Sequence, residues 1–321
     1  MKSKILYIVV PCYKEEEVLP ETSKRLKSKL EALIEQKKID SDSRIMFVND
    51  GSTDNTWKII QELHNSDKIY SGVNLSRNRG HQNALLAGMT VAVEYADMII
   101  SMDADLQDDI NAIDAMVENY LNGYDVVYGV RSSRKTDTFF KRFTAEAFYK
   151  LMKGLGVDIV FNHADYRLMS KRAVQGLLQF KEVNVFLRGI VPQVGYPWTT
   201  VEYERAERFA GESKYPLKKM LAFAFDGITS FSIKPIRLIT SLGVGISGIS
   251  IILLIWAIVT KILGGTVAGW SSLMVSIWFI GGIQLLCLGV VGEYIGKIYA
   301  ETKHRPLFII ENILNEKKKG E

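Results

Sequence analysis

Cysteine, proline and net charge are all scarce in this 321-residue sequence, and each shortage excludes a class of protein. Cys12 follows an apolar run in a charged region, whereas Cys287 lies in an uncharged region, so the pair is a poor disulfide and a disulfide-rich secreted scaffold is excluded. Seven prolines are too few for a collagen or a proline-rich disordered chain. A net charge of +4 is too small to indicate nucleic-acid binding.

Charge is missing almost completely from one long stretch. Between Leu238 and Gly292 the only charged residue is Lys261. This composition predicts two membrane-spanning helices, at about residues 238–260 and 271–292, joined by a short glycine-rich link. Basic residues flank the pair on both outer sides, which predicts that both chain ends are cytoplasmic. The alternative is a pair of buried helices in a soluble protein.

The remaining sequence divides around this hairpin into further segments. The run Ile5–Val10 is shorter than a signal-peptide core and is followed closely by Glu15, so it predicts a buried strand of a cytoplasmic domain. Residues 1–213 are expected to form that domain. An amphipathic segment over 214–235 is expected at the membrane interface, with a packed surface helix as the alternative. The two helices then occupy 236–296, and 297–321 form a cytoplasmic tail.

The first 130 residues alternate short apolar runs with helical patterns. This alternation predicts a mostly parallel sheet with helices on both faces, an α/β fold in which ligands bind beyond the carboxyl ends of the strands. No glycine-rich dinucleotide or phosphate-loop motif follows the first strand, which argues against a nicotinamide oxidoreductase and a P-loop kinase. The expected strands are Ile5–Val10, Arg44–Val48, Ile69–Leu75, Met98–Met102 and Asp125–Gly129. The expected helices are Glu16–Gln36, Asp54–His64, Gln82–Tyr95 and Ile110–Asn119.

Two aspartates leave the fourth strand at positions i and i+2. Asp103 and Asp105 would face the same way about 6.5 Å apart, where two carboxylates repel unless a cation bridges them. Oxygen ligands suit Mg²⁺ or Mn²⁺, and Gln107 adds a further oxygen. The pattern therefore predicts a divalent metal site, with an acidic turn that caps the next helix as the alternative.

Four sequence runs, taken in order, carry a resemblance to a known family. They are Val9–Glu17, Asn49–Thr56, Leu75–Gly80 and Asp103–Asp108, and together they resemble family 2 glycosyltransferases, which have a GT-A fold. The run Arg208–Tyr215 and the predicted hairpin narrow the likeness. The chain resembles the polyprenyl-phosphate glycosyltransferases, a branch that includes dolichol-phosphate mannosyltransferase-like and bactoprenol glucosyltransferase-like enzymes. The fold expected is thus a Rossmann-like GT-A domain with a membrane hairpin.

The resemblance implies an inverting transfer of a sugar from a nucleotide diphosphate sugar to a polyprenyl phosphate such as undecaprenyl phosphate. The transfer would take place at the cytoplasmic face of a bacterial inner membrane and serve cell-envelope glycosylation. A phosphate acceptor arrives ionised and needs cations more than a base. The donor is expected to contact Pro11, Tyr13, Glu15, Asp50, Arg77 and Asp103. The acceptor phosphate is expected to contact Arg131, Arg134 and Arg205. The catalytic set is expected to be Asp105, Arg131, Arg208, Ser213 and Lys214.

Several points stay open in the sequence. Glucose from UDP-glucose is the first expectation, followed by N-acetylglucosamine and by mannose from GDP-mannose. Lys14 stands where the family usually has Asn, and Asn49 where many relatives have Asp. Asp165 and Arg167 either shape the acceptor side or form a buried ion pair. A homo-oligomer is left open. Arg205 and Arg208 lie in a mixed-charge run, so salt bridges are the alternative to their roles in the site.

Two other functions compete with lipid-phosphate transfer. A polysaccharide synthase would need a transmembrane channel, an acceptor base and a Gln-x-x-Arg-Trp signature; two spans are too few for a channel, the signature is absent, and Asp165 is an imperfect base. A non-catalytic nucleotide-sugar sensor on a membrane anchor is the alternative of another class. The intact D-x-D pair and basic set argue against a loss of catalysis.

Overall fold

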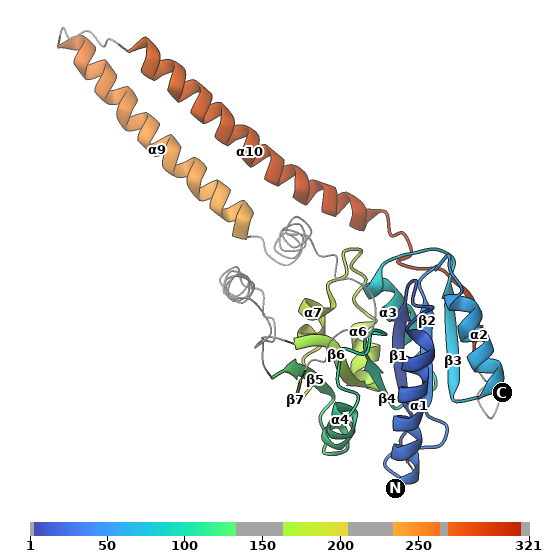
Figure 1. Cartoon of the computed structure of the whole chain (residues 1–321). Helices are drawn as coiled ribbons and strands as arrows, with labels where there is room; N and C mark the ends of the chain where they lie inside the picture. The colour runs from blue at the N-terminus through green and yellow to red at the C-terminus, as the bar shows by residue number, and fades with distance from the viewer. Residues whose placement is uncertain (1–2, 133–162, 205–233, 264–268, 316–321) are drawn as a thin grey trace. The chain divides into compact units, whose positions relative to one another are not determined.

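The computed structural model describes residues 3–132, 163–204, 234–263 and 269–315 (Figure 1). The chain divides into two compact units, one built around a sheet and one around two long helices, with the division near residue 215 and again near residue 305. The described strands are β1 (Leu6–Cys12), β2 (Arg44–Asn49), β3 (Tyr70–Leu75), β4 (Met98–Ser101), β5 (Val126–Arg131), β6 (His163–Ser170), β7 (Trp198–Tyr203) and β8 (Ile310–Leu314). The described helices are α1 (Leu19–Glu35), α2 (Thr56–Ser66), α3 (His81–Ala92), α4 (Ala112–Leu121), α6 (Lys171–Leu177), α7 (Leu187–Ile190), the 3₁₀ turn Val191–Val194, α9 (Lys234–Ile262) and α10 (Trp270–Thr302).

The eight strands form one sheet in the order β7-β5-β6-β4-β1-β2-β3-β8. The pairs β1/β2, β1/β4, β2/β3 and β5/β7 are parallel. The antiparallel pairs are β4/β6, β5/β6 and β3/β8. The prediction of a mostly parallel α/β sheet is therefore confirmed, and the carboxyl ends of β4, β1, β2 and β3 meet at one edge.

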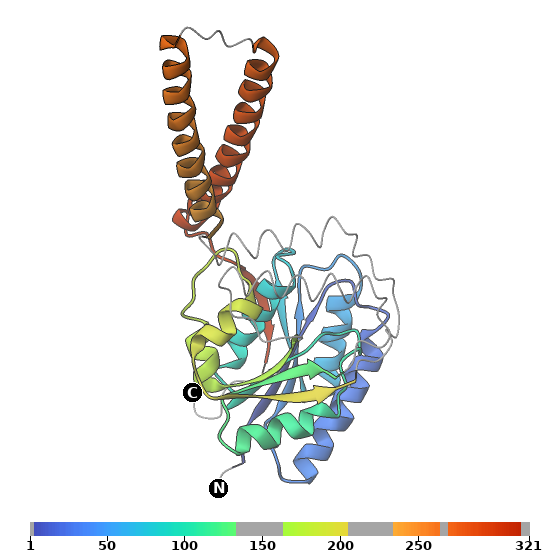
Figure 2. The ribbon, with the colours of Figure 1, turned by 90° about the vertical axis from the view of Figure 1, so that its left-hand side faces the viewer.

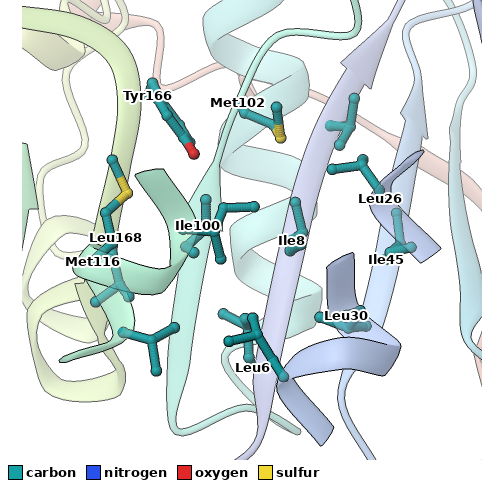
Figure 3. Packing of buried hydrophobic residues seen from close by; sticks show 14 of the residues in the cluster. Leu6, Ile8, Leu26, Leu30, Ile45, Ile100, Met102, Met116, Tyr166 and Leu168 are labelled. Carbon is teal, nitrogen blue, oxygen red and sulfur yellow. The ribbon is translucent and has the colours of Figure 1, made fainter. Parts of the chain in front are cut away.

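The central strands are buried on both faces, which explains why they read as continuous apolar runs. On β1, Leu6 and Ile8 belong to the core formed with α1 and α4, which Figure 3 shows with Leu26, Leu30 and Met116. The intervening residues of the strand point to the opposite face, because successive side chains alternate across a strand. There α3 packs so closely that a Cβ at Gly88 would lie 2.4 Å from Val9 Cγ1.

The first helix begins later than its apolar pattern suggested. The prediction placed its start at Glu16, whereas α1 begins at Leu19, with Pro20 in its first turn. Proline fits there because its missing N–H would have no helical partner at that position. The residues before it, Glu15 to Val18, form a turn in which Leu19 N donates to Glu15 O at 2.9 Å. This turn keeps Glu15 and Glu16 at the sheet edge.

The second unit consists mainly of α9 and α10 (Figures 1 and 2). They have 29 and 33 residues, about 44 Å and 50 Å at the helical rise. Lys234–Thr260 and Phe279–Thr302 are each long and apolar enough to cross a membrane. Two apolar helices thus occur where the sequence predicted them, although α10 continues beyond the predicted limit at residue 292.

A strand that the sequence analysis did not predict follows α10. Residues 310–314, which lie in the segment expected to form a tail, make β8 and pair antiparallel with β3. Ser76 N also donates to Ile309 O at 3.0 Å. The chain therefore returns from the two helices to the edge of the same sheet that it left, and Figure 2 shows this last strand in red.

Candidate functional site

The candidate site lies where β4, β1, β2 and β3 end, because each of these parallel strands is followed by one of the polar turns that the sequence singled out. The turn after β2 joins the turn after β3 through Asp50. Its two carboxylate oxygens accept the backbone N–H groups of Arg79 at 2.6 Å and Gly80 at 2.9 Å. Burial raises the pKa of Asp50, and these two N–H donors oppose the rise. Asp50 thus stabilises the turn after β3.

Gly51 allows that close approach. Its φ is +61°, a left-handed conformation, and a Cβ there would lie 2.4 Å from the carbonyl carbon of Arg77. Only glycine fits both requirements. The side chain of Arg77, a predicted donor contact, is exposed above this junction.

The turn after β1 is held by the turn after β2. Lys14 N donates to Ser52 Oγ at 3.0 Å, and Glu15 N donates to Thr56 Oγ1 at 3.0 Å. Lys14 has a φ of +57°, which a lysine rarely adopts. Asparagine tolerates that conformation better than lysine does.

The predicted donor contacts of this turn differ in accessibility. Pro11 is buried within β1, whereas the Tyr13 side chain is 45% exposed and Glu15 is half-buried. The Lys14 ammonium lies 5.6 Å from the centre of the Tyr13 ring. An exposed aromatic ring beside a cation and a carboxylate can stack a base and bond a ribose. The structure therefore brings Tyr13, Glu15 and Asp50 to one edge.

Asp103 follows β4, and its carboxylate meets groups from other elements. His81 Nε2, at the start of α3, lies 3.4 Å from Asp103 Oδ1. Desolvation raises the pKa of Asp103, and the nearby carboxylates of Asp165 and Asp105 raise it further, while His81 and Arg188 oppose them. Several negative charges therefore gather at the end of this strand.

Asp105 stabilises its own turn and does not cap the next helix, because α4 begins at Ala112 with Asn111 at its N-cap. Asp105 Oδ1 accepts the backbone N–H of Gln107 at 3.2 Å. Leu106, between them, has a φ of +57° and is buried. A non-glycine residue in this conformation costs free energy, and such strain concentrates at functional sites.

The antiparallel strand β6 places an ion-pair cluster beside Asp103. Asp165 Oδ1 lies 2.8 Å from Arg167 Nη2, and Asp165 Oδ2 lies 3.1 Å from Arg188 Nη2 of α7. The Arg167 side chain is fully buried. Although burial raises the pKa of Asp165, Arg188 and Arg167 outweigh it and hold that pKa well below its usual range. Of the two readings open in the sequence, the buried ion pair is present.

Arg188 was missed by the sequence analysis. It lies in Phe186-Leu187-Arg188-Gly189, which carries no recognisable motif. Its position depends on α7, where Leu187 N donates to Gln82 Oε1 at 3.0 Å and so ties α7 to α3. This tertiary contact helps to bring Arg188 to the carboxylates.

The carboxylates at this edge suit a divalent cation in their chemistry. Within the described residues, no group of three or more His, Cys, Asp or Glu side chains forms a ready metal cluster. Asp103 and Asp105 nevertheless supply hard oxygen donors. Desolvation is the main cause that raises the pKa of Asp103, and the negative charges of Asp165 and Asp105, which a cation would offset, add to it. The pair therefore fits Mg²⁺ or Mn²⁺ completed by substrate oxygens.

A second charged cluster surrounds Arg131 at the end of β5. Tyr203 donates its hydroxyl to Asp108 Oδ1 at 2.5 Å, and Arg131 Nη2 lies 3.9 Å from the same oxygen. Burial lowers the pKa of the Arg131 guanidinium, but Tyr203 and Asp108 outweigh this effect, so the pKa is raised overall. Asp108 is 4% exposed, and burial raises its pKa to about 6. It lines a cavity of about 640 Å³ between α1 and the loop before α4 that includes neither Asp103 nor Asp105.

Several predicted site residues lie outside the described parts of the chain. They are four basic residues and one serine, namely Arg134, Arg205, Arg208, Lys214 and Ser213. Most of the expected interfacial segment also lies outside the described parts. Their roles stay predictions.

Two family models match this chain, one on residues of the sheet unit and one on the two long helices. The model described as glycosyl transferase family 2 matches residues 7–178, and the one described as the GtrB C-terminal hairpin matches residues 234–298. The uncharacterized glycosyltransferase YkoT of Bacillus subtilis (strain 168) is 53% identical over 313 residues, which cover 97% of this chain and 93% of that protein. The bactoprenol glucosyl transferase of Shigella phage SfV is 42% identical over 307 residues, 95% of this chain and 97% of that protein.

Among solved structures, glucosyl-3-phosphoglycerate synthase from Mycobacterium tuberculosis, in complex with Mn²⁺, UDP-glucose and phosphoglyceric acid, is similar over 70% of this chain and 78% of that chain. It is 17% identical, and the TM-score is 0.45.

Proposed function

This chain belongs to glycosyl transferase family 2, and we propose that it transfers glucose from UDP-glucose to a polyprenyl phosphate at the cytoplasmic face of a bacterial membrane. The chain is a glycosyltransferase, and relatives named bactoprenol glucosyl transferase match it over both the sheet unit and the two helices. Their names support glucose as the sugar and a polyprenyl phosphate as the acceptor.

The proposed reaction is a direct displacement. A phosphate oxygen of the lipid forms a bond to the anomeric carbon, the bond between that carbon and the diphosphate oxygen breaks, and UDP leaves. The product is a polyprenyl-monophosphate glucose with inverted anomeric configuration. No proton has to be removed from the nucleophile, because a phosphate monoester with a second pKa of about 6 is largely ionised at neutral pH.

The observation that carries this proposal is the state of Asp165. A sugar hydroxyl acceptor would need a general base with a pKa near neutrality. Asp165, the base candidate from the sequence, is bonded by Arg167 and Arg188, and its pKa lies well below the usual range. A carboxylate held in this way is a poor base, which favours a phosphate acceptor over the hydroxyl acceptor of a polysaccharide synthase.

Asp108, unlike Asp165, is a carboxylate whose pKa burial raises to about 6. It is 4% exposed, and the Tyr203 hydroxyl occupies one of its oxygens. It therefore lacks the access that a base needs, and its proximity to Arg131 gives it a different task. Asp108 and Tyr203 orient Arg131, which we assign to the acceptor phosphate.

The donor would be held by the joined turns after β1, β2 and β3. Tyr13 stacks on the base, while Glu15 and Asp50 bond the base and ribose, and Arg77 meets the diphosphate. Asp103 and Asp105, with Gln107, would hold a divalent cation that offsets negative charge on the leaving diphosphate. Arg134 and Arg205 would join Arg131 at the acceptor, and Arg208, Ser213 and Lys214 would complete the site.

The connectivity of the chain supports a membrane hairpin with both ends on one side. β7 precedes α9 and β8 follows α10, yet both strands belong to one sheet. A chain that leaves and rejoins one folded unit must cross a bilayer an even number of times. We therefore propose a catalytic domain over 1–213, an interfacial segment over 214–235 and two crossings within 236–296, with both termini cytoplasmic.

One transfer assay tests the function. Membranes that contain the full-length protein are incubated with radiolabelled UDP-glucose, undecaprenyl phosphate and Mg²⁺ or Mn²⁺. We expect label in the lipid extract, which EDTA abolishes and added metal restores. Label in insoluble polymer would support a synthase instead, and a protein that binds the nucleotide sugar without transfer would support a sensor.

The matched variants for this assay are Asp105→Asn and Asp42→Asn. The first keeps an oxygen for the Gln107 N–H but removes the charge that a cation needs, so we expect transfer to fall at least about hundredfold. The second makes the same change in an exposed loop and should leave transfer within about twofold of wild type. Full transfer by Asp105→Asn would contradict the assigned metal site.

A further inference from the structure

Hydrogen-bonded polar side chains link the last strand of the chain to the turn after β2. Asn74 Nδ2 donates to Glu311 Oε2 at 2.8 Å, and Asn49 Nδ2 donates to Asn74 Oδ1 at 2.7 Å. Asn49 and Asn74 are paired residues of the neighbouring strands β2 and β3. The three side chains Asn49, Asn74 and Glu311 form what we call the amide relay.

A β-bulge brings Glu311 into the relay. The pairing of β3 with β8 runs Asn74 to Asn312 and then Leu75 to Ile310, so Glu311 is the extra residue. Bulges redirect side chains and occur often at sheet edges and beside active sites. Here the bulge directs the carboxylate of Glu311 toward Asn74.

The relay has a single direction. At one end, the Glu311 carboxylate only accepts hydrogen bonds; at the other, the Ser52 backbone N–H donates to Asn49 Oδ1 at 3.3 Å and can only donate. Asn49 is 2% and Asn74 8% exposed, so an amide turned the wrong way would lose its partners away from water. The two end groups therefore determine which way both amides point.

The relay ends at the donor turn. Ser52, whose N–H it holds, accepts the Lys14 N–H through its own Oγ at 3.0 Å. Lys14 has the left-handed φ of +57° and stands between Tyr13 and Glu15, the predicted contacts for base and ribose. A backbone in this conformation persists only where its surroundings hold it.

We propose that Glu311 is a positioning residue for the nucleotide sugar: it sets the direction of the amide relay, and the relay holds the Tyr13–Glu15 turn in its donor-binding conformation. The residue that follows the membrane helices thereby supports the turn that follows the first strand. This inference rests on the proposed function. It also explains Asn49, because an aspartate at that position could not donate to Asn74.

The test reverses the relay. In Asn49→Asp, Asn74 must turn to donate to the introduced carboxylate, and its oxygen then faces the Glu311 carboxylate. We expect the KM for UDP-glucose to rise about tenfold, equivalent to about 1.4 kcal/mol, with kcat and the KM for the lipid phosphate within about twofold of wild type. Glu311→Gln offers Asn74 either an oxygen or an NH2 group, so it permits both directions of the relay and is the background in which Asn49→Asp is tested again. In the double variant Asn49→Asp/Glu311→Gln, both side-chain hydrogen bonds of the relay reverse while the Ser52 N–H still donates to the introduced carboxylate, so the wild-type KM should be recovered.

A second readout needs no ligand, so it separates failure of the relay from failure of the proposed function. Amide hydrogen exchange of full-length protein in detergent should speed up about tenfold at Lys14 and Ser52 in Asn49→Asp and return to the wild-type rate in the double variant. Asn312→Asp, the same change one residue away on β8, is the control and should alter neither readout. Unchanged exchange in Asn49→Asp, or a double variant no better than Asn49→Asp, would overturn the proposal.

Discussion

Asp165 Oδ2 on β6 lies 3.1 Å from Arg188 Nη2 on α7, and this contact keeps a carboxylate ionised beside the D-x-D turn. The same carboxylate neutralises the fully buried guanidinium of Arg167. The contact therefore joins the stability of the sheet unit to the choice of acceptor, because it lowers the pKa of the one carboxylate that the sequence offered as a base.

The first prediction concerns the stability of this cluster. Asp165→Asn leaves Arg167 charged and buried without its partner, so the free energy of unfolding should fall by about 3 kcal/mol at pH 7. Arg188→Gln should cost about 1 kcal/mol, because Arg188 is 32% exposed and Asp165 keeps Arg167. Denaturant unfolding of detergent-solubilised protein measures both.

The pH dependence of stability checks the same cluster. The pKa of Asp165 is lowered in the folded protein, so its stabilisation is present above the unfolded pKa of about 3.9 and is lost as pH falls toward the folded value. That acid-dependent component should be absent from Asp165→Asn. The assigned ion pair would be contradicted if Asp165→Asn and Arg188→Gln lowered the free energy of unfolding equally. It would also be contradicted if wild type and Asp165→Asn lost stability equally as the pH falls.

The second prediction is the pH profile of transfer. If the nucleophile is a phosphate monoester, kcat/KM should rise to a plateau with an apparent pKa of about 6 and should not rise further between pH 7 and 8. Asp108 has a pKa of about 6 as well, so Asp108→Asn is the control. The rise of kcat/KM around pH 6 should remain in Asp108→Asn, because Asn keeps an oxygen that accepts the Tyr203 hydroxyl. If the rise disappeared in that variant, Asp108 would be the titrating group.

The third prediction concerns the left-handed lysines. Lys14→Asn should raise the free energy of unfolding by about 0.5–1 kcal/mol, because Asn tolerates the φ of +57° better than Lys. Lys37 has a φ of +56° after α1, far along the chain from the donor turn, so Lys37→Asn is the matched control. Thermal unfolding should show similar gains for both variants, with the KM for UDP-glucose within about threefold of wild type. A loss of stability in Lys14→Asn would contradict the conformation assigned to the turn.

The fourth prediction tests the hairpin by cysteine labelling in sealed cells. After Cys287→Ala, with Cys12 buried, a membrane-impermeant maleimide should label Gly269→Cys in intact cells. Lys303→Cys, at the other end of α10, should react only after the membrane is opened. Labelling of both positions from outside would contradict two crossings.

The regular core could be read from the sequence because both faces of the central strands are buried. Strands such as β1 consist of consecutive apolar residues, and Trp57, Ile60 and Leu63 mark one face of α2. The turns could be placed as well, since carboxyl ends of parallel strands share one edge. What the pattern did not reveal at Lys14 and Leu106 was the left-handed backbone, because nothing in their residue types favours it.

The remaining features depend on contacts between distant segments. β8 contains Glu311 and Asn312, both exposed, and its five residues form a strand only because β3 offers a free edge. Arg188 belongs to a four-residue helix that meets Asp165 only after β6 and α3 are in place. Local periodicity and motif spacing carry no information on such pairings.

The central claim is that a phosphate oxygen of the lipid displaces UDP from the sugar. The most direct measurement is NMR of the purified product made from UDP-[1-¹³C]glucose and a short polyprenyl phosphate, with the nucleotide by-product identified alongside. The account predicts an anomeric carbon coupled to one phosphorus, with inverted configuration, and one UDP released per product. Retained configuration, a lipid diphosphate with UMP, or an anomeric carbon bonded to a sugar hydroxyl would contradict it.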